Sequence, residues 1–375
     1  MAKGIKLFRI LGIQISLDIT WFVIFSLVVW SLAVGYFPMH YPGQGRMVYI
    51  ILGIVSSVLL FVSVLFHELS HSYVANRLGL DIREITLFIF GGVARLTREP
   101  DDPAVEFKVA IAGPISSIFL AALFWLLKNI IESVFTAPFI TAVLDYLVLI
   151  NIVLVVFNLI PGFPLDGGRV LRALWWWKTN DIRKATALTS SIGKGFAMLL
   201  IFFGIVQILF AANFLGGMWS VFIGLFLHQA AESGYQQVLL KNVLSGVEVN
   251  DAMTRNVIIV RYDYTIEKVV DDFFFVHHFI GFPVVSDGQV VGMLTLNDVR
   301  NVPKEKWGNT LVRDVMDSNM NEMIVGVGDS VMDVLTKMIN LGRGRLIAMD
   351  GDRLAGIITR RDIMKLMEFR TDLGI

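Results

Sequence analysis

The sequence predicts a polytopic α-helical membrane domain of about six transmembrane helices, followed by a soluble α/β domain. Of the 375 residues, 55% are hydrophobic and 17% are charged, whereas soluble domains average about 25% charged residues. The apolar stretches lie before about residue 240, and charged residues are regularly interspersed after it. The later region also contains an internal repeat with helix and strand patterns, which is typical of a small α/β fold.

Six apolar stretches each approach the ~20 residues that a helix needs to cross a bilayer. Lys and Arg are enriched before the first stretch, between the second and third, and between the fourth and fifth. By the positive-inside rule, both termini and the soluble region are therefore expected in the cytoplasm of a multi-pass cell-membrane protein in contact with the lipid bilayer. The expected spans are residues 16–36, 47–76, 104–127, 139–160, 191–212 and 214–235.

The composition excludes several other functions. The 32 basic and 32 acidic residues give a formal net charge of zero, so nothing indicates a nucleic-acid partner. The chain contains no cysteine, which excludes disulfide bonds and cysteine-ligated zinc.

The second apolar stretch ends in the motif His67-Glu68-Leu69-Ser70-His71. Two histidines four residues apart lie on one face of a helix, where both imidazoles can bind one zinc ion and the adjacent glutamate can activate water. Ionisable residues inside a bilayer are costly, so they are functional candidates. The alternative is a chance occurrence of the pattern.

A catalytic zinc site usually has three protein ligands, so a third must come from elsewhere in the chain. Asp166 is the best candidate, because it follows the fourth span on the same side of the membrane as His71. Residues 157–169 contain two prolines and three glycines, which indicates an unwound helix end that lines a polar cavity. The alternative is that Asp166 caps a loop beneath the membrane.

Together these residues resemble the site-2 protease family of intramembrane metalloproteases. That family combines H-E-x-x-H on one span with an N-x-x-P-x-x-P-L-D-G type motif on a later one, matched here by residues 67–71 and 158–167. Ala112-Gly113-Pro114 and Phe90-Gly91-Gly92-Val93 also resemble the family. The resemblance covers roughly residues 50–175. The loop at 128–138 is too short to hold the PDZ domain that is usually inserted in this family. The chain therefore most resembles the branch of sporulation proteases and archaeal relatives, which lacks that domain.

The resemblance implies that His67, His71 and Asp166 bind one zinc ion. It implies that Glu68 is the general base for the attacking water and then passes the proton to the leaving amine. Asn158 would be a catalytic residue that steadies the tetrahedral oxyanion, with an interhelical hydrogen bond as the alternative. The substrate would be a membrane-spanning protein, cleaved near the cytoplasmic side.

Residues 83–95 are predicted to form a hairpin-like strand region. An exposed strand edge could hold a substrate extended by strand addition. Extension matters because a helical peptide bond shields its own carbonyl, so a transmembrane substrate must unwind before attack. Asn151, on the face of the fourth span that carries Asn158, is expected to pack between helices.

The soluble region contains two copies of one unit. Residues 291–298 recur as 355–362, and residues 249–253 recur as 312–316. Units of this size rarely bury an adequate core alone, so we expect the copies to pair. Between these anchors we expect helical stretches at 266–279 and 331–341 and strands at 282–286 and 345–349.

The two copies resemble cystathionine-β-synthase (CBS) modules. Their G-x-x-[ST]-x-x-D segment is matched by Gly292 to Asp298 and by Gly356 to Asp362. In that family the aspartate accepts hydrogen bonds from ribose hydroxyls and the threonine approaches a phosphate. The resemblance therefore implies that an adenine nucleotide (ATP, ADP or AMP) binds at Thr295, Asp298, Thr359 and Asp362.

The alternative for this CBS pair is that it only mediates dimerisation. We expect a homodimer or higher oligomer through the pair. The expected domains are a membrane domain at 1–238 and CBS modules at 247–303 and 310–370.

These observations predict an intramembrane zinc endopeptidase whose CBS pair gates access in response to nucleotide. A CBS-regulated transporter or channel is the alternative, and it predicts polar residues spread along several spans. In this chain they concentrate at 67–71 and 158–166. A catalytically inactive membrane scaffold would have no need of Glu68.

Overall fold

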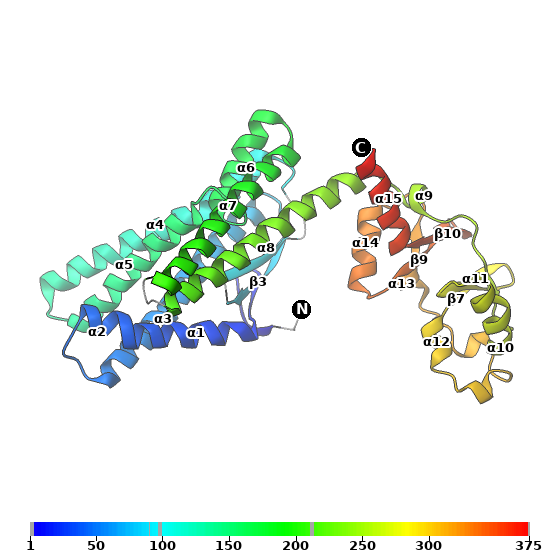
Figure 1. The fold of residues 1–375 in the computed structure, drawn as a ribbon, viewed down its shortest axis with the longest axis horizontal. Helices are drawn as coiled ribbons and strands as arrows, with labels where there is room; N and C mark the ends of the chain where they lie inside the picture. The colour runs from blue at the N-terminus through cyan, green and yellow to red at the C-terminus, as the bar shows by residue number, and fades with distance from the viewer. Residues whose placement is uncertain (1–3, 90, 97–99, 211–213, 374–375) are drawn as a thin grey trace. The chain divides into compact units, whose positions relative to one another are not determined.

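The protein is described here by a computed structural model of residues 4–89, 91–96, 100–210 and 214–373. The chain forms two compact units, Met1–Gln236 and Gln237–Ile375 (Figure 1). Phe90 of the Phe90-Gly91-Gly92-Val93 segment lies outside the described residues, as do residues 211 and 212 of the fifth expected span.

Five of the described helical segments in the first unit are long and apolar enough to cross a membrane. They correspond to the first five expected spans. Within the described residues the sixth expected span falls in α8 (Phe214–Leu244), which is not among these five, so its crossing stays a prediction. The first segment is continuous and consists of α1 (Ile19–Ser31), a π-helical turn (Leu32–Tyr36) and α2 (Phe37–His40). The other four are α3 (Arg46–Arg77), α4 (Pro103–Val134), α5 (Pro138–Asn158) and α7 (Ile182–Phe210).

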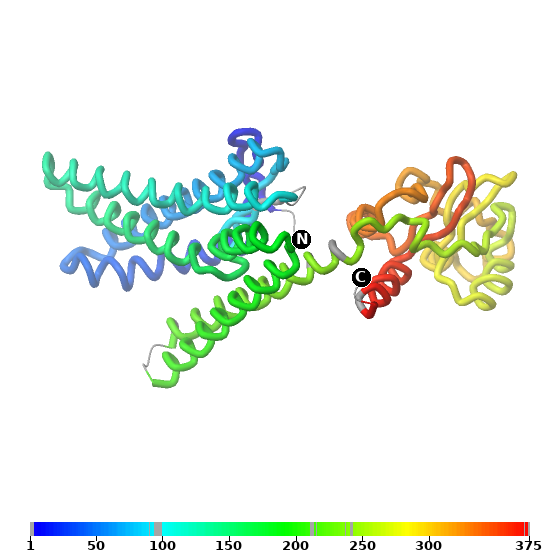
Figure 2. The backbone as a smooth tube through the Cα atoms, turned by 90° about the horizontal axis from the view of Figure 1, so that it is seen from above, coloured from blue at the N-terminus to red at the C-terminus, as the bar shows by residue number. Residues whose placement is uncertain are grey.

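Helix α4 packs against both α3 and α5 and runs alongside α5 (Figure 1, Figure 2). It begins where the Asp102 side chain accepts a hydrogen bond from the amide of Ala104 at 2.7 Å, with Pro103 in the first turn. Both features favour a helix start, because the aspartate satisfies a free amide and the proline lacks one. Helix α5 likewise begins with a proline, Pro138.

A four-stranded sheet packs against α3 and was only half predicted. Strands β3 (Ile82–Phe88) and β4 (Gly91–Leu96) confirm the hairpin expected at 83–95. The sequence prediction missed β1 (Ile5–Ile10) and β2 (Ile13–Leu17), which form a second hairpin. The first helix therefore starts at Ile19, not at residue 16.

The strand order is β1-β2-β3-β4, with β2 parallel to β3 and both hairpins antiparallel. Ile13, Ile15 and Leu17 of β2 alternate toward a buried cluster. That cluster also contains Val64, Leu65 and Leu69 of α3. The sheet is thereby fixed beside the helix that carries the two histidines, and β4 is left as an edge strand.

A further helix of the first unit, α6 (Asp166–Thr179), was not predicted. It follows the loop at 159–165 and begins with Asp166 as its first residue. Its glycines allow close packing, because a Cβ on Gly168 would collide with the backbone of Gly162 and Phe163. The predicted unwound segment after the fourth span is therefore a short loop that turns directly into a new helix.

The second unit contains two copies of one topology, as predicted from the repeat. Each has a three-stranded sheet in which one parallel and one antiparallel pairing share the central strand. The strands are β5 (Val260–Arg261), β6 (Gly281–Ser286) and β7 (Gln289–Thr295) in the first copy, and β8 (Ile324–Gly326), β9 (Arg345–Asp350) and β10 (Arg353–Thr359) in the second.

The expected helical stretches are present beside these sheets. The first is divided into α10 (Ile266–Val269), a π-helical turn (Val270–Phe274) and α11 (Phe275–His277), and the second is α14 (Val331–Asn340). Each of the two sheets has its own buried cluster, and a third cluster of Met293, Met323 and Ile347 joins the copies. The remaining elements are α9 (Val249–Ala252), α12 (Leu296–Arg300), two 3₁₀ turns (Lys304–Lys306, Val312–Asp314), α13 (Met320–Met323) and α15 (Arg360–Asp372).

Candidate metal centre

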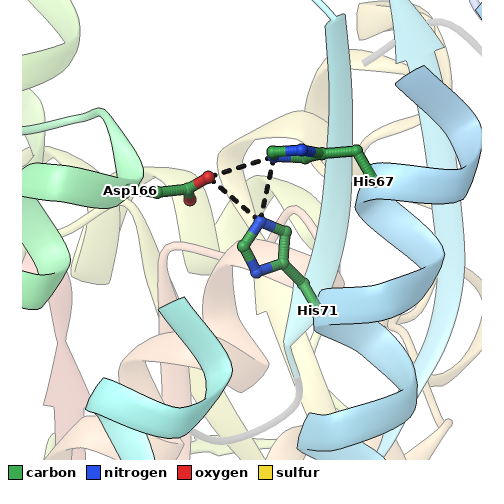
Figure 3. A group of neighbouring side chains, drawn as sticks. All are labelled: His67, His71 and Asp166. Atoms are coloured by element: carbon green, nitrogen blue, oxygen red, sulfur yellow. Dashed lines mark hydrogen bonds and ion pairs between the residues drawn. The ribbon is translucent and has the colours of Figure 1, made fainter. Parts of the chain in front are cut away.

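Three buried side chains from two helices converge in the first unit (Figure 3). His67 and His71 project from one face of α3, and Asp166 projects from the first turn of α6. Asp166 Oδ2 lies 3.0 Å from His67 Nε2 and 3.1 Å from His71 Nε2. The two Nε2 atoms are 3.2 Å apart.

This triangle of atoms fits a zinc ion. Ligands at about 2.0–2.1 Å from a tetrahedral zinc lie about 3.3 Å from one another. All three separations are close to that value, and the donor set of two imidazoles and one carboxylate is one that zinc accepts. Within the described residues, this is the one group of three or more His, Cys, Asp or Glu that could hold a metal ion.

Helix α4 supplies the outer partners of both imidazoles. His71 Nδ1 donates to the carbonyl oxygen of Val109 at 2.7 Å, so its proton is on Nδ1 and the Nε2 lone pair is free for a metal. His67 Nδ1 lies 2.9 Å from the hydroxyl of Ser117. The rotation of both rings is thus set by a helix that contributes no ligand.

Gly113 lies between these two contacts on the same face of α4. A Cβ at this position would collide with the Nε2 atoms of both His67 and His71. The Ala112-Gly113-Pro114 motif therefore has a local physical reason, because α4 approaches the imidazoles too closely for any side chain.

One turn before Val109 on this face of α4, Glu106 forms a buried ion pair with Arg172 of α6. Its Oε1 accepts a hydrogen bond from Arg172 Nε at 2.7 Å and a second from Nη2, and Arg169 Nε lies 4.0 Å away. Glu106 Oε2 is buried without a hydrogen-bond partner among the described residues. The Arg172 guanidinium also lies over the ring of Phe163, at 5.1 Å from its centroid. No local pattern in the sequence indicates this pair.

Glu68 lies beneath the edge strand β4. A Cβ on Gly92 would lie 2.9 Å from Glu68 Cδ, so the backbone of β4 passes directly over this side chain. Glycine at position 92 permits this approach. The segment resembling Phe90-Gly91-Gly92-Val93 thus brings a strand edge to the glutamate of the motif.

The structure places the two asparagines of α5 in different surroundings. Asn151, expected only to pack, is fully buried and donates to the hydroxyl of Ser63 in α3 at 3.2 Å. Asn158 is the last residue of α5, is partly exposed, and makes no side-chain hydrogen bond to the described residues. The interhelical hydrogen bond considered for Asn158 is therefore made by Asn151.

In the second unit, each predicted threonine pairs with its own aspartate. Thr295 Oγ1 donates to Asp298 Oδ2 at 2.6 Å, and Thr359 Oγ1 donates to Asp362 Oδ2 at 2.6 Å. These pairs lie at the starts of α12 and α15. The Thr254 hydroxyl also lies 3.5 Å from Asp362 Oδ1. The four residues thus occupy equivalent positions in the two copies.

Arg345, at the start of β9, is a candidate that the sequence analysis missed. Its guanidinium is partly buried and donates to the carbonyl of Gly281 at 3.4 Å, and it has no carboxylate partner among the described residues. Burial lowers the pKa of this guanidinium. Gly281 begins β6 and Arg345 begins β9, so the two residues hold the same position in the two copies. An alignment of the copies would have shown an arginine in one where the other has a glycine.

Comparison with known proteins agrees with both units. The profile of peptidase family M50 matches residues 55–136 and 128–202. The CBS domain profile matches residues 249–305 and 312–368.

The chain also has full-length relatives. It is 32% identical over 368 residues to a zinc metalloprotease of Methanocaldococcus jannaschii, covering 98% of this chain and 97% of the relative. It is 31% identical over 142 residues to stage IV sporulation protein FB of Bacillus subtilis, covering 38% of this chain and 47% of that protein. Among solved structures, the site-2 protease from M. jannaschii is 31% identical, with 62% of this chain and 94% of that one covered, and a TM-score of 0.42.

Proposed function

Because this chain belongs to peptidase family M50, the site-2 protease family, we propose that it cleaves membrane-spanning proteins within the membrane, near its cytoplasmic side. The chain is a zinc metalloendopeptidase with a membrane helical domain and two CBS domains. The observation that carries the proposal is the convergence of His67, His71 and Asp166 at mutual distances that fit zinc.

In this proposal the Nε2 atoms of His67 and His71 and the carboxylate of Asp166 hold zinc. Zinc bound there would supply Lewis-acid activation of water and of the scissile carbonyl. Glu68 accepts the proton of the attacking water and then delivers it to the leaving amine nitrogen as the C–N bond breaks. The Asn158 amide donates to the carbonyl oxygen as negative charge develops, a role supported by its free side chain at the end of α5.

We propose that the substrate binds as an extended strand along β4. Among the described strands β4 lies at the edge of the sheet, and Gly92 brings that edge over Glu68. A strand added there would pair alternate carbonyls with β4, leave the others free and hold the peptide near the general base. An α-helical substrate would keep its carbonyls in internal hydrogen bonds, so it must unwind first.

The experiment that tests this function uses the full chain in lipid vesicles with reporter proteins. Each reporter carries one transmembrane segment interrupted by glycine and proline, so that it unwinds readily. Glu68→Gln should lower cleavage about 100-fold or more while leaving one zinc per chain, because it removes only the general base. Asp166→Ala should remove zinc and cleavage together.

Two results would contradict the proposal. Cleavage that persists in Glu68→Gln would exclude this residue as the base. Ion flux through vesicles containing the wild-type chain, with no cleavage of any reporter, would favour the transporter or channel.

For the orientation, we propose that both termini and the CBS domains are cytoplasmic. The distribution of Lys and Arg supports this arrangement. Because the chain has no cysteine, single cysteines can report on it. Asp352→Cys should react with an impermeant maleimide only from the cytoplasmic side, and Gln44→Cys only from the opposite side. The reverse pattern would overturn the orientation.

We further propose that the CBS pair binds an adenine nucleotide through Thr295, Asp298, Thr359 and Asp362 and thereby controls cleavage. The matching geometry of both Thr–Asp pairs and the unpaired guanidinium of Arg345 support this assignment. Asp298→Ala with Asp362→Ala should abolish binding of ATP, ADP and AMP and the response of cleavage to them. If binding is lost but the response of cleavage remains, regulation by this site is wrong.

We also propose that two chains pair through their CBS modules, with domains at 1–238, 247–303 and 310–370. Four large apolar side chains near the end of the first helical stretch support pairing, because they are 50–68% exposed: Phe275, Val276, Phe279 and Ile280. Phe275→Ser should reduce the mass of the detergent-solubilised full chain from dimer to monomer. An unchanged mass would move the interface elsewhere.

A further inference from the structure

The N-terminal hairpin turns on an apolar residue in an unfavourable backbone conformation. Leu11 has φ of 52°, in the left-handed region, and is 68% exposed. Hairpin turns that need this conformation usually use Asn, Asp or Gly, which adopt it easily and are well solvated. A leucine at an exposed turn indicates that its surroundings are apolar.

Strand β1 extends the same character along the edge of the sheet. All six of its residues are exposed, and they include Leu7, Phe8 and two basic residues, Lys6 and Arg9. Only Asp18 separates β2 from the first membrane-spanning helix, so the hairpin must lie at the membrane. Because an open strand edge is not tolerated in the hydrocarbon region, β1 belongs at headgroup depth.

A cavity of about 240 Å³ lies between the hairpin turn and the end of α3. Leu11 and Ile13 form one wall, and Tyr73, Asn76 and Arg77 form the other. The Arg77 guanidinium lies 5.4 Å from the centroid of the Tyr73 ring and has no carboxylate partner among the described residues. An unpaired guanidinium in a partly apolar cavity, at the end of a membrane-spanning helix, matches a phosphate that adjoins an acyl chain.

We propose that this cavity binds the phosphate headgroup of an anionic phospholipid. Arg77 donates to the phosphate oxygens, and Leu11 and Ile13 contact the glycerol and the first acyl carbons. Lys6 and Arg9, which also lack carboxylate partners among the described residues, attract neighbouring anionic headgroups. The bound lipid then holds the β1 edge of the same sheet whose opposite edge, β4, passes over Glu68.

Lipid binding by the full chain in neutral detergent tests the proposal directly. Phosphatidylglycerol and phosphatidylcholine are added separately, and bound lipid is counted by native mass spectrometry. Phosphatidylglycerol should bind more tightly, and Arg77→Ala should weaken it about fivefold, the contribution expected of one basic residue at an anionic surface. The matched control is Arg83→Ala, because Arg83 is exposed and already pairs with Asp81 at 2.6 Å.

Three outcomes would overturn the proposal. Equal weakening by Arg77→Ala and Arg83→Ala would mean that the protein responds only to total charge. No weakening by Arg77→Ala would remove the arginine from the site. Displacement of the lipid by an equal concentration of soluble glycerol phosphate would assign the cavity to a free phosphate ester and not to a membrane lipid.

A second measurement does not depend on Arg77. Leu11→Cys, labelled with an environment-sensitive fluorophore in the otherwise cysteine-free chain, is reconstituted in vesicles of phosphatidylcholine and phosphatidylglycerol in equal parts. Its emission should shift to the blue and be quenched by a lipid that carries a spin label near the headgroup. Asp352→Cys in the second unit should show neither effect. An unquenched label at residue 11 would place the hairpin in water and refute the site.

Discussion

Replacing Arg172 by methionine is expected to weaken zinc binding without removing any zinc-binding atom. Arg172 contacts Glu106 of α4 on one side and the ring of Phe163 on the other. Asp166 lies between Phe163 and Arg172 in the sequence, at the junction of loop and helix. Arg172 therefore acts as a positioning residue that holds the start of α6, and with it Asp166, against the two histidines.

The cost follows from what the substitution leaves behind. Glu106 is fully buried, and its Oε2 already lacks a partner among the described residues, so the loss of Arg172 leaves the carboxylate with only Arg169, whose Nε lies 4.0 Å from Oε1. Breaking such a pair costs about 3–5 kcal/mol of stability. Loss of outer-shell support typically weakens metal binding about 10–100-fold, which corresponds to about 1.4–2.7 kcal/mol.

Two measurements separate positioning from stability. The dissociation constant for zinc is obtained by competition with a chromophoric chelator, and the unfolding temperature is measured without metal. In the double variant Glu106→Gln, Arg172→Met, the buried carboxylate at position 106 is removed as well, so the unfolding temperature should largely recover. The weakened zinc affinity should persist, because the link between α4 and α6 is still absent.

Lys128→Met is the matched control. Lys128 also projects from α4, and its Nζ lies 2.6 Å from the carboxylate of Asp145, far along the helix from Glu106. Its loss should lower the unfolding temperature slightly and leave the zinc affinity unchanged. The positioning role is refuted if Arg172→Met binds zinc as tightly as the wild type, or if Lys128→Met weakens zinc binding equally.

Three further changes are expected to have separable effects. Ser117→Ala removes the partner of His67 Nδ1 and should weaken zinc binding about 10-fold by chelator competition. Gly92→Ala places a methyl group against Glu68 and should reduce reporter cleavage with zinc content unchanged, whereas alanine at the exposed Val93 should not. The pKa of Asp317 is held below its ordinary value of 3.8, first by the backbone N–H of Asn319 and then by Arg343. This stabilisation of the folded state is present above pH 3.8 and is lost as the pH falls through the pKa that Asp317 has in the folded state. In Asp317→Asn, the hydrogen-exchange rates of the second unit should therefore depend less on pH in the acid range than in the wild type.

The parts of the fold that could be predicted are those encoded by local patterns. Apolar stretches gave the spans, and helical spacing put His67 and His71 on one face. Self-similarity gave the two copies in the second unit, because each copy repeats both its strand pattern and its G-x-x-T-x-x-D segment. The position of Asp166 was inferable because prolines and glycines mark the end of a span.

The missed features depend on contacts between distant segments. Strand β2 merges into the apolar run of the first span, so its alternation of Ile13, Ile15 and Leu17 has only Gly12 to mark its start. Glu106 and Arg172 look like ordinary charged residues beside a membrane until the packing of α4 on α6 buries them. Neither shows a local pattern that would distinguish it from a solvated side chain.

The H-E-x-x-H motif alone does not determine the metal centre. Its two imidazoles could rotate freely, and its third ligand belongs to another helix, so a separate element must fix all three. Glu106, Val109, Gly113 and Ser117 recur every three or four residues and therefore share one face of α4. Through this face α4 holds α6, orients both imidazoles and leaves room for their Nε2 atoms. The geometry that fits zinc is thus set by a helix that provides none of the ligands.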